Sequence, residues 1–136
     1  MGIWDKCKLL QFKELGDDRG KLIVVEGEES IPFAIKRVFY IYNSDRDVVR
    51  GEHANRESAF VLINVSGSSK VRISDGKVED IVLLDKPGKG LYIPKMVWKD
   101  MYDFSEDSVL LCLASTHYNS EEYIRDFEEF RKEATL

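Results

Sequence analysis

A histidine and an asparagine two residues apart are the strongest chemical signal in this chain. His53 and Asn55 stand in a polar stretch, residues 50–56, with the sequence RGEHANR. Side chains two positions apart on a strand point to the same face. In a small β barrel that face is the interior, so we expect both side chains to point into a functional pocket. Two alternatives stay open: His53 could make a structural hydrogen bond inside the barrel, and Asn55 could bond its own backbone.

The spacing around these residues fits the two-part metal signature of cupin barrels. That signature has His-x-His with a Glu four or five positions on, and then Pro-x-Gly with a His three positions after the Gly. The four ligand positions here are His53, Asn55, Phe60 and Lys99, and the frame is completed by Gly67, Gly90, Pro94 and Met96 in place of the second glycine. A catalytic metal needs about three good protein ligands. Asn is a poor ligand, Phe is none and an ammonium repels cations, so we expect a cupin frame without metal or other cofactor.

Several arginines and aromatic residues could bind an anionic ligand near this stretch. A guanidinium reads a diphosphate through two parallel hydrogen bonds, which makes Arg19, Arg37 and Arg50 candidates. The aromatic candidates are Tyr40, Trp98 and Tyr102. The alternative is structural: the arginines could be solvated strand residues, and the aromatic rings could belong to the core.

The elements that must position these residues are short strands. Runs rich in β-branched and aromatic residues predict strands over residues 8–13, 22–26, 35–42, 59–65, 70–74, 78–84, 90–93, 97–104 and 109–114. Turn residues separate them, as in Asp17-Asp18-Arg19-Gly20 and Asp75-Gly76. About nine short strands with turns every eight to twelve residues indicate a β-sandwich or barrel.

Only near the C-terminus does the spacing of apolar residues change from the period of a strand to that of a helix. Ser120 is the expected N-cap, and Tyr123, Phe127 and Phe130 fall on one helical face. This predicts a terminal helix packed on the outside of the barrel. We find no linker, repeat or low-complexity segment, so residues 1–136 are expected to form one domain.

Composition excludes several classes of partner. Of the 136 residues, 43% are hydrophobic and 33% charged, and the formal net charge is −5, which argues against a nucleic-acid or anionic-membrane binder. The sequence has no apolar run long enough to span a membrane and no signal-peptide pattern at its N-terminus. Cys7 and Cys112 are read as reduced core thiols, with a disulfide as the alternative. A cytoplasmic location is the resulting expectation.

Several segments together resemble the sugar 3,4-ketoisomerase family, also called WxcM-like proteins. The matching segments are IPFAIKRV (31–38), RGEHA (50–54), GLYI (90–93), WKDMYDF (98–104), LAS (113–115) and EYIRDF (122–127), and the resemblance extends from Phe12 to Phe130. The family consists of metal-free cupins that act on thymidine-diphosphate-linked (dTDP-linked) 4-keto-6-deoxyglucose. The resemblance implies an all-β, RmlC-like jelly-roll barrel with a C-terminal helix, a homodimer, and a shift of the keto group between C4 and C3. The products would feed unusual amino sugars of bacterial surface polysaccharides.

The resemblance also assigns roles to residues. The family pocket holds two histidines in His-x-His; the first corresponds to His53, and Asn55 stands at the second, catalytic one. Lys99 stands where the family commonly has His or Arg, and Arg19 where it has Arg or Tyr. Because an amide cannot act as a base near neutral pH, we expect His53 to transfer the proton. Lys99 would stabilise the oxyanion and lower the pKa of His53.

Three functions remain open at this point. The first is a sugar 3,4-ketoisomerase acting on a dTDP-linked 4-keto-6-deoxy sugar. The second is a non-catalytic module that binds a nucleotide sugar, and the third is a different enzyme on the same frame, such as an epimerase or dehydratase. The replacement of the second histidine by Asn55 is what keeps the two alternatives open.

Overall fold

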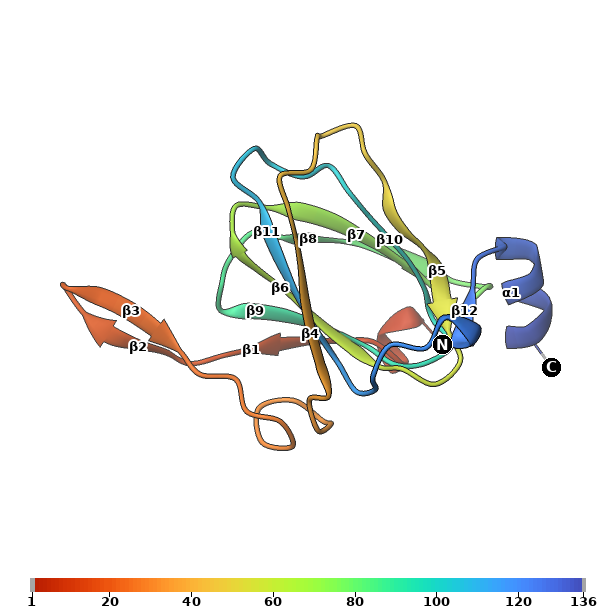
Figure 1. The fold of residues 1–136 in the computed structure, drawn as a ribbon, viewed down its shortest axis with the longest axis horizontal. Coiled ribbons are helices and arrows are strands. Elements are labelled where there is room, and N and C mark those ends of the chain that lie inside the picture. Colours follow the sequence, from red (N-terminus) through yellow and green to blue (C-terminus); the bar gives the residue numbers. More distant parts are fainter. Residues whose placement is uncertain (1, 136) are drawn as a thin grey trace.

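Two five-stranded antiparallel sheets face each other and enclose the core. The computed structural model describes residues 2–135 (Figure 1). The first sheet contains, in spatial order, β1 (Lys8–Gln11), β9 (Lys89–Ile93), β6 (Phe60–Ser66), β11 (Val109–Ala114) and β4 (Arg37–Tyr42). The second contains β12 (Tyr123–Ile124), β5 (Arg50–Asn55), β10 (Trp98–Tyr102), β7 (Ser69–Ser74) and β8 (Glu79–Leu84). The predicted all-β fold is therefore confirmed.

Alternating side chains on the strands build the core between the sheets. On β6, Phe60 and Leu62 point inward, and on β7 the inward residues are Val71 and Ile73. All four are at most 1% exposed. The period of two seen in the sequence thus places one apolar face of each sheet against the other.

The outer faces of both sheets are also covered. On the first sheet, Val61 and Ile63 pack beneath Ile31, which belongs to the irregular segment between β3 (Gly20–Ile23) and β4. On the second sheet, Trp98 packs against Phe127 and Phe130 of the C-terminal helix. The predicted packing of a helix on the outside of the barrel is confirmed.

The start of that helix differs from the prediction. The chain forms a 3-10 turn, η2 (Ser120–Glu122), capped by Asn119; it then pairs with β5 through β12, and only after that enters α1 (Phe127–Ala134), which Asp126 caps. Pairing with the open edge of β5 satisfies backbone groups that a helix would otherwise satisfy. It also buries Ile124, which is 2% exposed.

A separate hairpin extends from the barrel near the N-terminus. After η1 (Ile3–Asp5) and β1, strands β2 (Glu14–Asp17) and β3 (Gly20–Ile23) pair with each other and with no other strand of the described chain. Figure 1 shows this hairpin pointing away from the barrel, at the opposite end from α1. The predicted turn around Asp18 and Arg19 is confirmed, whereas the strand predicted over residues 22–26 ends at Ile23.

The helices of this chain are short. The longest in residues 2–135 is α1, with eight residues, and none has the length and apolar character that crossing a membrane requires.

Candidate active site

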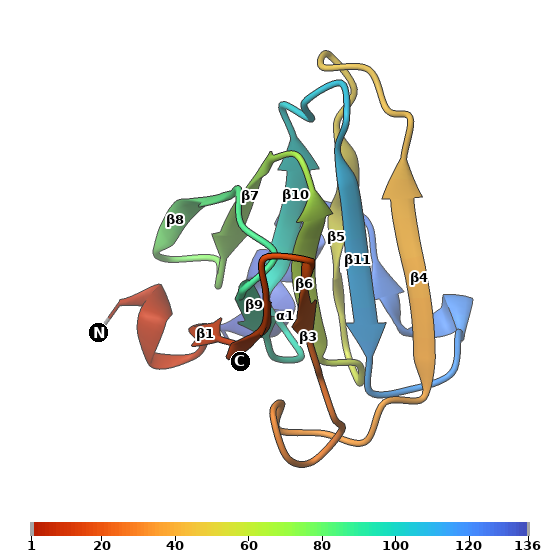
Figure 2. The ribbon, with the colours of Figure 1, turned by 90° about the vertical axis from the view of Figure 1, so that its left-hand side faces the viewer.

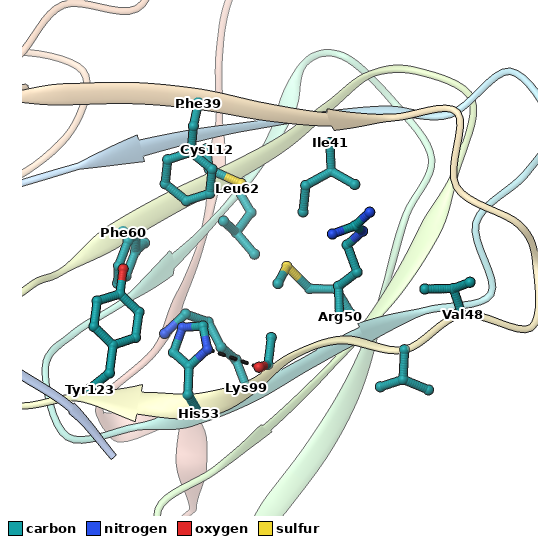
Figure 3. A pocket seen from close by; sticks show the side chains of 13 residues that line it. Phe39, Ile41, Val48, Arg50, His53, Phe60, Leu62, Lys99, Cys112 and Tyr123 are labelled. Carbon is teal, nitrogen blue, oxygen red and sulfur yellow. Dashed lines mark hydrogen bonds between the residues drawn. The ribbon is translucent and has the colours of Figure 1, made fainter. Parts of the chain in front are cut away.

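A cavity of about 530 Å³ opens between the two sheets. Figure 3 shows His53 and Lys99 entering it from one side and Phe39 and Ile41 from the other. Its lining is completed by Val48, Val49, Arg50, Gly51, Phe60, Leu62, Met101, Cys112 and Tyr123. The walls are mostly apolar. Of the polar lining residues, His53, Lys99 and Tyr123 gather at one end and Arg50 lies toward the other, and a mostly apolar wall with a few polar groups is the usual composition of a small-molecule site.

A bulge in β5 sets the direction of the His53 side chain. The pairing of β5 with β10 shifts by one residue, so that Lys99 faces His53 while Asp100 faces Gly51. Gly51 and the residue after it both adopt positive φ, 86° and 55°. A Cβ atom on Gly51 would lie 2.9 Å from the carbonyl oxygen of Lys99, so this position requires glycine.

His53 is held as a neutral imidazole with one free nitrogen. Its Nδ1–H donates to the carbonyl oxygen of Gly51 at 2.9 Å, because a carbonyl can only accept. Nε2 therefore carries a lone pair. Burial, followed by the positive charge of Lys99, lowers the pKa of His53 to about 4, against the opposing effect of the Gly51 hydrogen bond. At neutral pH the imidazole is available as a base.

Lys99 presents a buried ammonium beside this imidazole. Only 3% of the residue is exposed. Its Nζ donates to Oδ1 of Asn55 at 3.1 Å and lies 4.3 Å from the centre of the Phe60 ring. Burial lowers the pKa of Lys99 to about 8, and the carboxylate of Glu122 acts in the opposite direction. At neutral pH the group is mostly charged and can still give up a proton.

A buried carboxylate lies behind Asn55. Glu122 is 5% exposed, and its Oε1 accepts hydrogen bonds from the backbone amides of Glu57 and Ser58, both at 2.9 Å. Its other oxygen accepts from the Ser58 hydroxyl. Burial favours the neutral acid, but these hydrogen bonds outweigh it and lower the pKa of Glu122. Glu122 is therefore an anion in the layer behind the cavity.

Tyr123 and Arg37 form a second polar pair at the same end. The Tyr123 ring packs edge-on against the His53 imidazole, with centroids 4.7 Å apart. Its hydroxyl accepts a hydrogen bond from Arg37 Nη1 at 3.2 Å. The guanidinium of Arg37 lies near the rings of Phe39, Phe60 and Tyr118, and within residues 2–135 its Nε and Nη2 have no hydrogen-bond partner.

Sequence reasoning missed Tyr123 because it assigned this residue to a helix. The only signal for its role is the pairing of Tyr123 with Asn55 across β12 and β5. That pairing is long-range and leaves no local pattern in the sequence.

The structure brings five of the predicted residues together. His53, Lys99 and Arg50 line the cavity directly. Asn55 and Arg37 lie behind the lining: Asn55 accepts a hydrogen bond from Lys99, and Arg37 donates one to Tyr123. Arg50 lies on the same strand as His53, toward the other end of the cavity in Figure 3, and its Nε donates to the Ser44 hydroxyl at 3.3 Å.

Trp98 and Tyr102 do not line the cavity, and their proposed substrate contacts must be corrected. Both alternate with Lys99 and Met101 along β10, so they face the outer side of the sheet. Trp98 packs there against α1, and its Nε1 donates to Asp100 at 3.2 Å. The sequence did not reveal which face of β10 is the inner one.

Tyr40 and Arg19 also lie away from the cavity of their own chain. Tyr40 is 60% exposed on the outer face of β4, the edge strand visible in Figure 2. Arg19 stands at the tip of the β2–β3 hairpin, where it pairs with Asp17 at 2.7 Å, and its side chain is 90% exposed. Neither residue is among those that line the cavity.

The four frame positions do not fit a metal ion in this structure. The Lys99 ammonium lies among them, hydrogen-bonded to Asn55 and over Phe60. Within residues 2–135, no three His, Cys, Asp or Glu side chains gather in a way that could hold a metal. The imidazole and the fixed positive charge beside it can support proton transfer.

Comparisons with known proteins identify the family to which this chain is similar. The family model described as "FdtA: WxcM-like, C-terminal" matches residues 5–135. A TDP-4-oxo-6-deoxy-alpha-D-glucose-3,4-oxoisomerase from Aneurinibacillus thermoaerophilus is 41% identical over 125 residues, which cover 92% of this chain and 90% of that protein.

Solved structures of similar proteins have the same fold. A 3,4-ketoisomerase from Helicobacter canadensis is 42% identical and superimposes with a TM-score of 0.93, over 96% of this chain and 98% of that one. A histidine-to-asparagine variant of the 3,4-ketoisomerase QdtA from Thermoanaerobacterium thermosaccharolyticum, in complex with TDP-4-keto-6-deoxyglucose, is also 42% identical. It superimposes with a TM-score of 0.93 over 96% of this chain and 94% of the other.

Proposed function

The chain belongs to the WxcM-like FdtA family of cupin-fold sugar 3,4-ketoisomerases, and from this premise we propose that it converts a TDP-linked 4-keto-6-deoxy hexose into the 3-keto isomer. The observation that carries the proposal is the free Nε2 of His53 beside the Lys99 ammonium at one end of the cavity. Family membership favours this isomerase over the binding module and the epimerase or dehydratase.

His53 moves the carbon-bound proton. Its Nε2 removes the proton from C3, which the neighbouring C4 carbonyl acidifies, and the bonding electrons form an enediolate with its charge on O4. The imidazolium then returns the proton to C4 while the C3 hydroxyl loses its own proton and becomes the carbonyl. No electron leaves the sugar, so the step needs no redox partner. The enediolate also favours the imidazolium, because an opposite charge raises a basic pKa.

Lys99 acts on the sugar oxygen atoms O4 and O3. Its ammonium holds the developing negative charge on O4, as oxyanion-binding groups do. The same group can give a proton to O4 and receive one from O3. The apolar wall of Phe39, Ile41 and Leu62 suits the C6 methyl group of a deoxy sugar, which offers no hydrogen bond. Arg50, toward the other end of the cavity from His53, then binds the diphosphate.

A homodimer is part of this proposal. Val38, Tyr40 and Tyr42 expose 55–64% of their surface along the outer face of β4, while Leu15 and Leu22 expose 40% and 57% on the β2–β3 hairpin. Such apolar surface is typical of an interface. In a dimer the hairpin would pack on the second copy, and Arg19 could contact the ligand only in the partner's cavity. Light scattering at micromolar concentration should give twice the chain mass; a monomer would reject this part.

We place this activity in the cytoplasm, in a route to sugars of bacterial surface polysaccharides. The two cysteines support this location, since Cys7 and Cys112 are both buried free thiols and structural disulfides belong to oxidising compartments.

Proton exchange tests the proposed function. In deuterated buffer the protein should convert TDP-4-keto-6-deoxyglucose to the 3-keto isomer, with deuterium at C3 of recovered substrate and at C4 of product, both followed by NMR. Replacing His53 with Asn should slow the conversion by about 10²- to 10⁴-fold, the range for loss of a general base. If the wild type binds the sugar nucleotide without any exchange, the binding module replaces the isomerase. Exchange that survives His53→Asn would place the base on another residue.

A further inference from the structure

We propose that the Lys99 ammonium is a built-in cation standing where other cupins hold a metal ion, and that Asn55 and Phe60 are the residues that position it. The four metal-ligand positions of the cupin frame hold His53, Asn55, Phe60 and Lys99. Three of the side chains meet at one point, because Nζ of Lys99 lies 3.1 Å from Oδ1 of Asn55 and 4.3 Å from the centre of the Phe60 ring. His53 faces Lys99 directly across the β5–β10 ladder.

Asn55 and Phe60 are suited to hold an ammonium group and are poor ligands for a metal ion. The amide oxygen of Asn55 is a neutral acceptor, and the face of an aromatic ring attracts a cation through its quadrupole. Both residues are at most 1% exposed, so their geometry is rigid. An ammonium has three N–H donors. With one directed to Asn55 and the ring of Phe60 beside it, the ammonium remains able to bond a ligand in the cavity, which Lys99 lines.

The backbone supports the same arrangement. The carbonyl of Asn55 accepts a hydrogen bond from the amide of Met96 at 2.7 Å. Met96 adopts a φ of 58° at the position where the frame has glycine, which accommodates positive φ freely. The chain therefore keeps the backbone of the frame while the ligand side chains have changed.

The charge of Lys99 is not cancelled locally. No carboxylate in residues 2–135 lies within ion-pair distance of its Nζ, and Glu122 is engaged by Ser58 and two backbone amides. The ammonium can therefore act on charge that develops in the cavity. The titratable or charged groups that influence it are His53 on β5, Glu122 on η2, Arg37 on β4, Cys112 on β11 and Cys7.

The catalytic part of this inference rests on the proposed function, whereas the geometric part does not. A metal-binding experiment tests the geometry without any turnover. The triple variant Asn55→His, Phe60→Glu, Lys99→His restores the ligand set of the frame. It should bind one zinc ion per chain with micromolar or tighter affinity, measured by calorimetry and elemental analysis.

The matched control retains the ammonium. The double variant Asn55→His, Phe60→Glu, with Lys99 in place, should bind zinc at least 10²-fold more weakly than the triple variant, because the ammonium lies where the ion must sit. The wild type should carry no stoichiometric metal. Zinc binding by the double variant as tight as by the triple variant would overturn the proposal, and so would a folded triple variant that binds none.

A titration of Lys99 keeps the proposal falsifiable if the triple variant does not fold. The Lys99 side chain, followed by carbon-detected NMR, should titrate at lower pH in Asn55→Leu, which removes the acceptor, and at higher pH in Asn55→Asp, which adds a charge. Asn64→Leu is the control, since Asn64 is a buried amide bonded to Ser69 and Ser108. A merely structural role for Asn55 predicts the same Lys99 titration in all variants, and that result would reject the positioning role.

Kinetics then separate this inference from the proposed function. In an active enzyme, Asn55→Leu should lower kcat by about tenfold or more with little change in KM, as expected when a group that acts on the transition state is misplaced. If the wild type proves inactive, the proposed function fails, while the zinc and NMR measurements still decide whether Lys99 stands at the metal position.

Discussion

The Nδ1 atom of His53 lies 2.9 Å from the carbonyl oxygen of Gly51, two residues earlier in the same strand. This bond spans the bulge at which β5 and β10 lose their regular register. It fixes the imidazole tautomer and turns Nε2 toward the cavity. A local irregularity of the backbone thus determines which ring nitrogen of the candidate base carries the proton, while burial and the Lys99 charge keep the ring neutral.

Gly51→Ala should reduce activity without removing a catalytic group. The new Cβ would lie 2.9 Å from both the Lys99 carbonyl oxygen and the Met101 Cε atom, at a φ of 86°. We expect kcat to fall by about 10- to 100-fold, because small displacements of catalytic groups have large effects. Steady-state kinetics of Gly2→Ala serve as the control, since a Cβ there meets nothing within 4 Å. Equal activity of both variants would contradict the role given to the bulge.

His53 should make the protein sensitive to acid. Its pKa in the folded state is about 4, below the ordinary 6.5. As the pH falls from 6.5 toward 4, the unfolded chain binds a proton that the folded chain does not, so folding stability is lost. In urea unfolding, the free energy of unfolding of the wild type should fall by about 3 kcal/mol more than that of His53→Gln between neutral pH and pH 4. The exposed His117→Gln variant should follow the wild type; if His53→Gln does so as well, burial of the neutral imidazole is not supported.

Lys99→Met should stabilise the protein at neutral pH and inactivate it. Below pH 8 the folded state must hold a buried ammonium, whose pKa burial has lowered from 10.5 to about 8. Removing that charge should raise the free energy of unfolding by about 1–3 kcal/mol. The difference in free energy of unfolding between Lys99→Met and the wild type should narrow as the pH rises from 8 toward 10.5. In that range the folded lysine has lost a proton that the unfolded one retains. Thermal unfolding of the exposed Lys95→Met variant provides the comparison, and a loss of stability in Lys99→Met at pH 7 would argue against this account.

Arg50→Ala should weaken nucleotide binding through loss of charge. Calorimetry with thymidine diphosphate should show about tenfold lower affinity, consistent with one charge-assisted contact. The salt dependence of binding should become shallower. Arg131, on the exposed side of α1, offers a control. Arg131→Ala should leave the affinity for thymidine diphosphate and its salt dependence unchanged. The same affinity loss in both variants would point to a nonspecific effect.

Tyr123→Phe should reveal the cost of leaving Arg37 unpaired. The Tyr123 hydroxyl accepts the one hydrogen bond that this guanidinium makes within residues 2–135. Removing it should destabilise the fold by about 1–3 kcal/mol. Tyr118→Phe is the matched control, because Tyr118 also lies near Arg37 but is 62% exposed. Denaturant unfolding that gave the two variants equal stability would show that the hydroxyl contributes nothing to holding Arg37.

The sequence by itself determined the fold class and the residues around which the candidate site is proposed. Period-two alternation, as in Phe39 and Ile41 against Tyr40 and Tyr42, fixes strands and their faces, since only one face of each sheet can be buried between two sheets. Turn residues such as Asp75-Gly76 fix where strands reverse. The polar stretch around His53, flanked by apolar strands, indicated the candidate site, because buried polar groups need hydrogen-bond partners.

The tertiary structure alone decided how the site is assembled. Asn55 and Lys99 are 44 positions apart, and no local pattern encodes that one holds the other. The inner face of β10 depends on its register with β5, which is why Trp98 was misplaced while Lys99 was not. Tyr123 lies at the candidate site because its segment, despite helical periodicity in the sequence, pairs as a strand with the open edge of β5. In each case a long-range contact outweighed a local preference, because satisfying buried backbone groups and side chains is worth more than intrinsic propensity.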